Sequence, residues 1–316
     1  YLSKTFETFK NNRFVISKRL AAQRLAKQVS GSPVYDPNTG SNAGYADGYG
    51  PTSAEVLIPA FLAAYCNKDA SAVTLDAMPG FLSMMPNWKI QYGGLQRSEL
   101  VKKYLKQFNL SHAYRSSYSV GNYTTNYAYD PDLIDGLNYV RDAQENFLPQ
   151  RVISSISISE SLSPLIGFDA TMQNSLQARV EIKKSRTLTL SLSNNQLMEN
   201  RSNELVVGTG YSFQEVPITI KAGGSQRKFQ SDLDLRFDLS IRDNIIIMRK
   251  LEEDVNIPTS GQTVVTAKFT ASYRLSTRFQ LKFYYDQVVN KPIVQTSYAT
   301  SNTKVGFSLS FTLANM

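Results

Sequence analysis

A run of alternating side chains between residues 176 and 192 limits the possible folds most strongly. Most even positions are apolar, among them Val180, Ile182, Leu188 and Leu190, whereas the odd positions are polar or charged. A period of two predicts a β-strand. A strand of roughly 17 residues would extend on the order of 55 Å, which is long for a soluble β-sandwich but typical of tilted strands that project beyond a bilayer.

The same alternation recurs along the chain from Trp88 onward. It marks strands over 88–92, 108–119, 162–172, 229–242, 264–275, 279–286 and 305–313. Short polar pairs predict tight turns at Gln173-Asn174, Asp243-Asn244 and Ser276-Thr277. We therefore expect antiparallel hairpins in chain order, in an all-β fold that forms part of a transmembrane antiparallel β-barrel.

The two sides of these strands predict two environments. The polar rows carry several charges, which need water, so they predict a wide, hydrated barrel lumen and not a packed interior. The side chains expected to face the lumen are Arg179, Glu181, Lys183, Thr187, Thr189, Asp232, Asp234, Arg236, Asp238, Lys268, Arg274, Ser308 and Ser310. Those expected to face lipid are Leu188, Leu190, Leu192, Leu233, Leu235, Phe237, Leu239, Phe269, Phe279, Leu281, Phe307, Leu309 and Phe311.

The first third of the chain has a different pattern. Residues 5–28 have apolar side chains at helical spacing and a basic remainder, which predicts one or two amphipathic helices. Residues 30–53 are rich in Gly, Ser, Asn and Pro and predict a loop. Thr52 and Glu55 have the spacing of a capping box before a short buried helix. We expect residues 1–84 to form a helical and loop insertion between barrel strands, and residues 85–316 to supply the carboxy-terminal strands.

The net charge of the chain is compatible with several classes of partner. The 34 Lys and Arg residues exceed the 26 Asp and Glu residues, giving a formal net charge of +8. Such a charge suits anionic lipid, acidic cargo or nucleic acid. The basic stretch near the start is better explained as a solvated helix face, so we expect no nucleic acid partner. The chain begins mid-pattern without Met, as a mature or truncated piece of a longer protein would.

The residue types needed for catalysis are scarce. The single histidine, His112, falls in an apolar row, and the single cysteine, Cys66, lies in an apolar run. The acidic cluster 252–254 lacks the spacing of a cation site and falls in an expected hairpin loop. We predict that the protein is not an enzyme and that it holds no cofactor or metal.

Several segments resemble the carboxy-terminal part of the SprA/Sov family. The resemblance covers most of the chain, in order, and its most specific stretch is LSLSNNQLMENRSNE. The segments are GYGPTSAEVLIPAFLAAY (48–65), MPNWKIQYGGL (85–95), SPLIGFDATMQN (163–174), 183–211, RKFQSDLDLRFDLSIRDN (227–244), RKLEEDVNIPTSGQ (249–262) and 284–313. The last strand also resembles the assembly signal of outer-membrane proteins, although it lacks a terminal Phe.

The resemblance implies a function. SprA-like proteins are the outer-membrane translocon of the type IX secretion system of Bacteroidota, a single-chain barrel of about 36 strands. The implied partners are the remainder of the same barrel, outer-membrane lipid, a PorV-like barrel over a lateral opening, a periplasmic plug protein and folded cargo with a carboxy-terminal signal domain. In gliding relatives the cargo includes motility adhesins. The alternatives are an independent small outer-membrane barrel, acting as porin or adhesin, and a soluble β-rich binding module.

Overall fold

The computed structural model describes residues 3–39, 44–76, 86–94, 98–222, 225–253, 255–276, 278–294 and 298–311. Within them the chain is mostly β-strand, with three helices. The helices are α1 (Lys4–Lys27), α2 (Ala54–Tyr65) and α3 (Glu99–Tyr104). The strands are β1 (Trp88–Tyr92), β2 (Leu105–Thr125), β3 (Arg151–Met172), β4 (Gln177–Ser191), β5 (Gln196–Ala222), β6 (Ser225–Lys250), β7 (Asn256–Arg274), β8 (Phe279–Pro292) and β9 (Thr300–Phe311).

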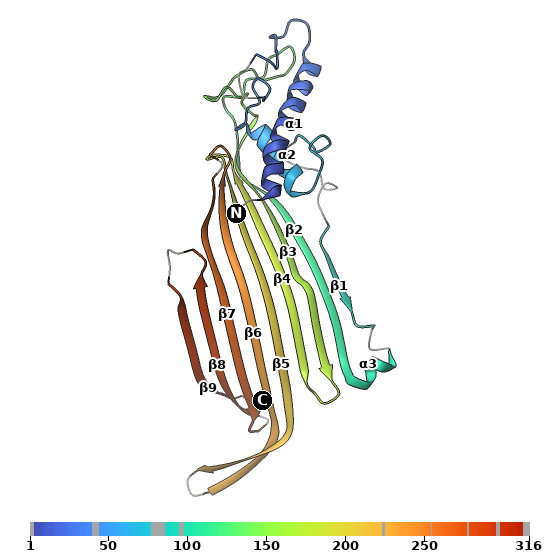
Figure 1. The fold of residues 1–316 in the computed structure, drawn as a ribbon, viewed down its shortest axis with the longest axis vertical. Coiled ribbons are helices and arrows are strands. Elements are labelled where there is room, and N and C mark those ends of the chain that lie inside the picture. The colour runs from blue at the N-terminus through green and yellow to red at the C-terminus, as the bar shows by residue number, and fades with distance from the viewer. Residues whose placement is uncertain are drawn as a thin grey trace, which may run out of the picture.

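All the strands belong to one antiparallel sheet. The sheet has nine strands in chain order, so each strand pairs with the next one along the chain (Figure 1). The predicted turn at Gln173-Asn174 is confirmed: the Leu176 N–H donates to Asn174 Oδ1 at 3.2 Å, and the Met172 N–H donates to the Leu176 carbonyl at 2.7 Å. Of the turn predicted at Ser276-Thr277, Thr277 lies outside the described residues, and the Ser276 N–H donates to the Phe279 carbonyl at 3.1 Å. The all-β prediction and the antiparallel pairing in chain order are therefore confirmed, although β5, between β4 and β6, is absent from the strands expected from alternation.

The turn predicted at Asp243-Asn244 is wrong. β6 continues without a break through these residues to Lys250, and Asn244 pairs with Ser202 on one side and Gln262 on the other. The short polar pair has the composition of a turn, but two neighbouring strands continue past it, and their ladder hydrogen bonds keep the backbone extended. The strand instead ends before the 251–255 segment.

The β5–β6 hairpin extends beyond its neighbours. Pairing of β4 with β5 ends at Gly210, and pairing of β6 with β7 begins at Leu233, so residues between these points pair only within the hairpin. The hairpin projects from the end of the sheet opposite α1 and α2 (Figure 1).

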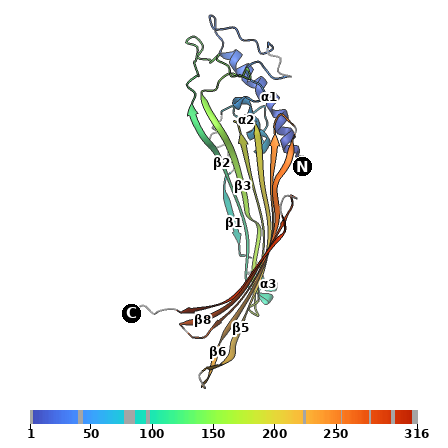
Figure 2. The same ribbon diagram turned by 90° about the vertical axis from the view of Figure 1, so that its left-hand side faces the viewer.

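A helical cap covers the other end of the sheet. We use "cap" for α1, α2 and the 126–150 segment that links β2 to β3 (Figures 1 and 2). Phe9 of α1 contacts Phe61 and Tyr65 of α2, with ring centroids 6.0 and 6.3 Å apart. The 126–150 segment, which the sequence placed with the strands, thus belongs with the helices; the division at residue 84 stays a prediction, and it lies outside the described residues.

Helix α1 confirms the predicted helix but not all of its predicted apolar face. Phe6, Phe9 and Leu20 are buried, whereas Phe14 and Leu25 are 36% and 41% exposed. Arg13 and Arg24 take two further buried positions of the helix, where Arg13 donates to the Pro51 carbonyl at 3.3 Å and Arg24 to the Asn138 carbonyl at 2.7 Å. A helical pattern read from apolar residues alone does not identify these two buried arginines.

The capping box predicted at Thr52 and Glu55 is wrong. The N-cap of α2 is Ser53, whose side chain makes no capping hydrogen bond. Thr52 Oγ1 instead accepts a hydrogen bond from Asn146 Nδ2 at 3.1 Å. The hydroxyl thus joins the start of α2 to the 126–150 segment, a contact between distant parts of the chain that local spacing does not reveal.

Arg24 lies in the middle of the cap. Its guanidinium is buried, donates to the Tyr49 hydroxyl at 3.1 Å and to the Asn138 carbonyl at 2.7 Å, and lies 3.6 Å from the ring centroid of Phe147. Burial raises the pKa of the Tyr49 hydroxyl and of the nearby Glu55 carboxyl, and the charge of Arg24 partly offsets both shifts. One cation therefore joins α1 to two separate loop segments.

We predict that Arg24→Met loosens the cap by about 2 kcal/mol, because two charge-assisted hydrogen bonds and a cation–π contact are lost. Amide hydrogen exchange across α1 and residues 126–150 measures this loss. Lys27→Met, at an exposed position of the same helix, is the matched control and should leave exchange unchanged. Equal protection in both variants would contradict a joining role for Arg24.

Candidate lumen surface

Strand register divides the side chains of the sheet between two faces. Residues that are directly opposite on neighbouring strands point to the same side of a sheet. Thr189 is opposite Met198 and Ser157, whereas Leu190 is opposite Leu197 and Ile156. Followed from β4 to β9, the residues predicted to face the lumen lie on one face, which we call the polar face. Those predicted to face lipid lie on the other, which we call the apolar face.

A row of alternating charges crosses the polar face. Each member of the row is the cross-strand neighbour of the next, from β3 to β9. In strand order the row is Asp169, Arg179, Gly208, Asp238, Lys268, Asp286 and Lys304. Apart from the glycine, negative and positive side chains alternate. Opposite charges on neighbouring strands attract, so the row favours this register while its net charge stays close to zero.

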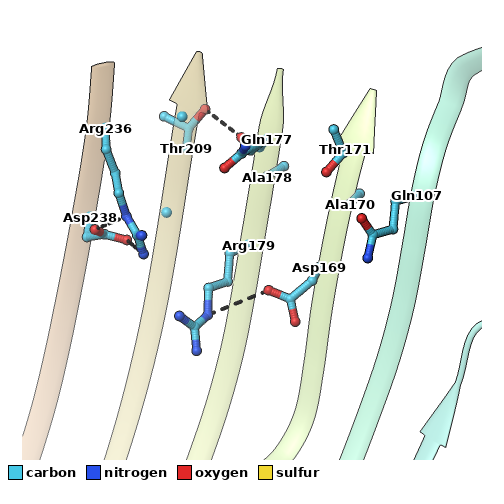
Figure 3. Close-up of a pocket in the computed structure, with 12 residues that line it drawn as sticks. Gln107, Asp169, Ala170, Thr171, Gln177, Ala178, Arg179, Thr209, Arg236 and Asp238 are labelled. Atoms are coloured by element: carbon cyan, nitrogen blue, oxygen red, sulfur yellow. Dashed lines mark hydrogen bonds and ion pairs between the residues drawn. The ribbon is translucent and has the colours of Figure 1, made fainter. Parts of the chain in front are cut away.

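Ion pairs connect charged side chains within this row and beside it on the polar face. Arg179 Nε is 3.7 Å from Asp169 Oδ1, and Arg179 Nη2 is 2.5 Å from Glu181 Oε1. Lys183 Nζ is 3.2 Å from Glu181 Oε2 and 3.7 Å from Glu204 Oε2. Figure 3 shows Arg179 directed toward Asp169 across the strands, with Arg236 beside Asp238. These side chains form an ion-pair network and not an isolated strong charge.

Gly208 leaves space for this network. A Cβ atom there would be 2.5 Å from Asp238 Oδ1 and 3.7 Å from Arg179 Cβ. Without that atom, the two charged side chains lie over the strand and line a surface depression of about 240 Å³ (Figure 3). The local sequence does not indicate this role of Gly208, because it depends on neighbours that are distant in the chain.

The apolar face carries large exposed side chains along its lower part, away from the cap. Phe307 is 73% exposed, Leu309 62% and Phe237 41%. Phe283 and Phe307 contact each other across β8 and β9, with centroids 5.1 Å apart. A continuous exposed apolar surface of this kind marks contact with a partner or a membrane. Among the described helices, none is long and apolar enough to cross a membrane.

The lipid-facing prediction is wrong for Leu188 and Leu190. Both are fully buried in the core that joins the cap to the sheet, where they pack with Ile156 and Leu197. Leu192 packs against the same core. The three residues are on the predicted face, but α1 and α2 cover that part of it. An alternating pattern shows which face of a strand is apolar. It does not show whether protein or lipid covers that face.

Other candidate sites offer no reactive arrangement. His112 Nδ1 lies 2.6 Å from the Leu165 carbonyl oxygen, where the β2–β3 register shifts. Glu253 binds Lys250 at 2.7 Å, and Asp254 lies outside the described residues. Within the described ranges, no three His, Cys, Asp or Glu side chains are grouped to hold a metal ion. The absence of enzymatic activity stays a prediction.

Comparison with known proteins assigns the sequence to no family. No family model matches the sequence, and no curated protein matches it either.

Proposed function

We propose that this chain forms part of the wall of an outer-membrane protein-conducting translocon, as the carboxy-terminal segment of a SprA/Sov-like protein of the type IX secretion system. The observation that carries the proposal is the two-faced, nine-stranded sheet, with a row of alternating charge on one face and exposed Phe and Leu on the other. In this assignment the polar face borders a water-filled lumen and the lower apolar face borders outer-membrane lipid.

The edges of the sheet favour a wall segment over a small self-closing barrel. β1 and β9 lie at opposite edges, and in the described part of the chain each pairs with a single neighbour (Figure 1). An exposed strand edge in a bilayer leaves backbone groups without hydrogen-bond partners, which is costly. Further strands of the same barrel would satisfy both edges.

The charge row suits the passage of folded proteins. A lumen with mixed charge remains wet, and its near-neutral row gives cargo of either sign no strong site at which to stop. The proposed cargo is folded protein with a carboxy-terminal signal domain, including adhesins in gliding bacteria. A PorV-like barrel and a periplasmic plug protein would close the lateral and periplasmic openings.

The size of the native polypeptide tests this proposal. We expect an antibody raised against residues 226–262 to detect a band in outer membranes far above the 35.4 kDa of this chain. Depletion of that polypeptide should leave signal-bearing cargo in the periplasm, whereas depletion of an unrelated barrel should not. A heat-modifiable band near 35.4 kDa with normal cargo export would contradict the proposal and favour a small independent barrel.

A further inference from the structure

A polar belt interrupts the apolar face between its exposed lower part and the cap. Along β4, the apolar residues Val180 and Ile182 are followed on the same face by Lys184 and Arg186, and Leu188 then enters the cap core. The neighbouring strand β5 changes at the same level, with Asn203 opposite Lys184 and Arg201 opposite Arg186. The belt therefore marks the upper limit of the lipid-facing band in the proposed assignment.

The belt contains a basic depression. It has a volume of about 240 Å³, and its charged lining consists of Lys184, Arg186 and Arg201 with one acid, Glu160. Arg186 forms an ion pair with Glu160 and lies 5.9 Å from the ring centroid of Tyr65, at the end of α2. The cap thus borders the depression on one side, and the exposed apolar band borders it on the other.

The depression keeps excess positive charge. Arg201 Nε is 3.4 Å from Glu199 Oε1, but the same carboxylate also binds Arg249 at 3.0 Å. Lys184 is exposed and forms no ion pair among the described residues. With three cations against one acid in the lining, the depression attracts an anion.

Aromatic side chains lie at the same level. Tyr114, which is also part of the lining, donates from its hydroxyl to Glu160 Oε1 at 3.1 Å, and its ring stacks on Trp88 at 4.5 Å between centroids. Tyr and Trp concentrate where a membrane protein meets lipid headgroups. Basic and aromatic side chains beside an apolar band are the combination that an anionic lipid requires.

We propose that this depression binds the phosphate of an anionic lipid headgroup, with Lys184 and Arg201 as its main partners and the acyl chains along Val207 and Leu205 of the apolar face. The inference depends on the membrane placement of the proposed function. A Lys or Arg near a membrane surface contributes about fivefold in affinity for anionic lipid, and phosphate is the group that both side chains bind well.

Adjacent lysines on opposite faces give a matched test. The intact protein, purified in detergent micelles, is titrated with short-chain phosphatidylglycerol or phosphatidylcholine, and retained lipid is counted by native mass spectrometry. Lys184→Gln should weaken phosphatidylglycerol binding about fivefold, whereas Lys183→Gln, on the polar face, should not. The Lys184→Gln, Arg201→Gln double variant should lose roughly 25-fold, as two such contributions multiply.

Three results would overturn the proposal: equal weakening by the two lysine variants, equal binding of phosphatidylglycerol and phosphatidylcholine, or full displacement of the lipid by inorganic phosphate at an equal concentration. The last would assign the depression to free phosphate. A polypeptide near 35.4 kDa that still binds phosphatidylglycerol through Lys184 would contradict the translocon but keep this site. A giant polypeptide in which Lys184→Gln does not weaken phosphatidylglycerol binding would support the translocon but refute this lipid site.

Discussion

Arginine at position 207 is expected to block insertion of the protein into the outer membrane, whereas arginine at position 206 is expected to be tolerated. These adjacent valines differ only in the face to which they point. Val207 is 41% exposed on the apolar face and lies between Val180 and Leu239, well below the polar belt. A charge there would meet hydrocarbon, at a cost of about 2–4 kcal/mol near the middle of the bilayer.

Val206 provides the matched control. It is opposite Glu181 and Ser240 on the polar face, so an arginine there would join an existing ion-pair network in water. Both variants are compared by the amount of heat-modifiable protein in isolated outer membranes. We expect strong loss for Val207→Arg and near-normal levels for Val206→Arg. Equal loss in both would refute the assignment of the two faces, and loss for Val206→Arg alone would invert it.

The strands were predictable because alternation is a local signal. The strands over 162–172 and 176–192 follow from the period of two and from a polar turn at Gln173-Asn174, whereas the first half of β3, from Arg151, does not follow from that pattern. The continuity of β6 was not predictable in this way, because it depends on both neighbouring strands extending past Asp243. The burial of Leu190 likewise depends on where α1 and α2 pack on the sheet. The sequence of the strand itself does not indicate that position.

The polar face was predictable, but its organisation was not. Arg179, Asp238 and Lys268 were assigned to the correct shared face from their own strands. Their place in one row with Asp286 and Lys304 depends on the stagger between strands, which is set by the turns and bulges together. The role of Gly208 is apparent only from its place in this row, where the missing side chain leaves space for two charged neighbours.

The buried pair formed by Glu199 and Arg249 is a further feature that alternation did not indicate. Arg249 is 1% exposed and Glu199 6%, beneath the cap. Arg249 Nη2 binds Glu199 Oε2 at 3.0 Å, Nη1 donates to Asn256 Oδ1 at 2.6 Å, and the guanidinium lies 5.4 Å from the ring centroid of Phe6. The pair thus connects β5 and β6 to the first turns of α1.

We predict that Glu199→Ala destabilises the junction between cap and sheet by about 3–5 kcal/mol, because a buried guanidinium loses its counter-charge. Limited proteolysis of folded protein in micelles measures the change as faster cleavage in residues 126–150. Glu204→Ala is the control on the same strand. Its contacts with Lys183 and Ser240 are more exposed, and its loss should cost less than about 1 kcal/mol.

A double variant separates two contributions to the loss of stability: the missing Glu199–Arg249 ion pair and the cost of leaving Arg249 buried without a counter-charge. Replacing a whole buried ion pair by apolar residues is often neutral, whereas removing one partner is not. The Glu199→Leu, Arg249→Met double variant should therefore regain most of the protection that Glu199→Ala loses. If the double variant is cleaved faster still, the pair contributes net stability of its own. If Glu199→Ala is cleaved no faster than Glu204→Ala, the buried pair does not hold the cap on the sheet.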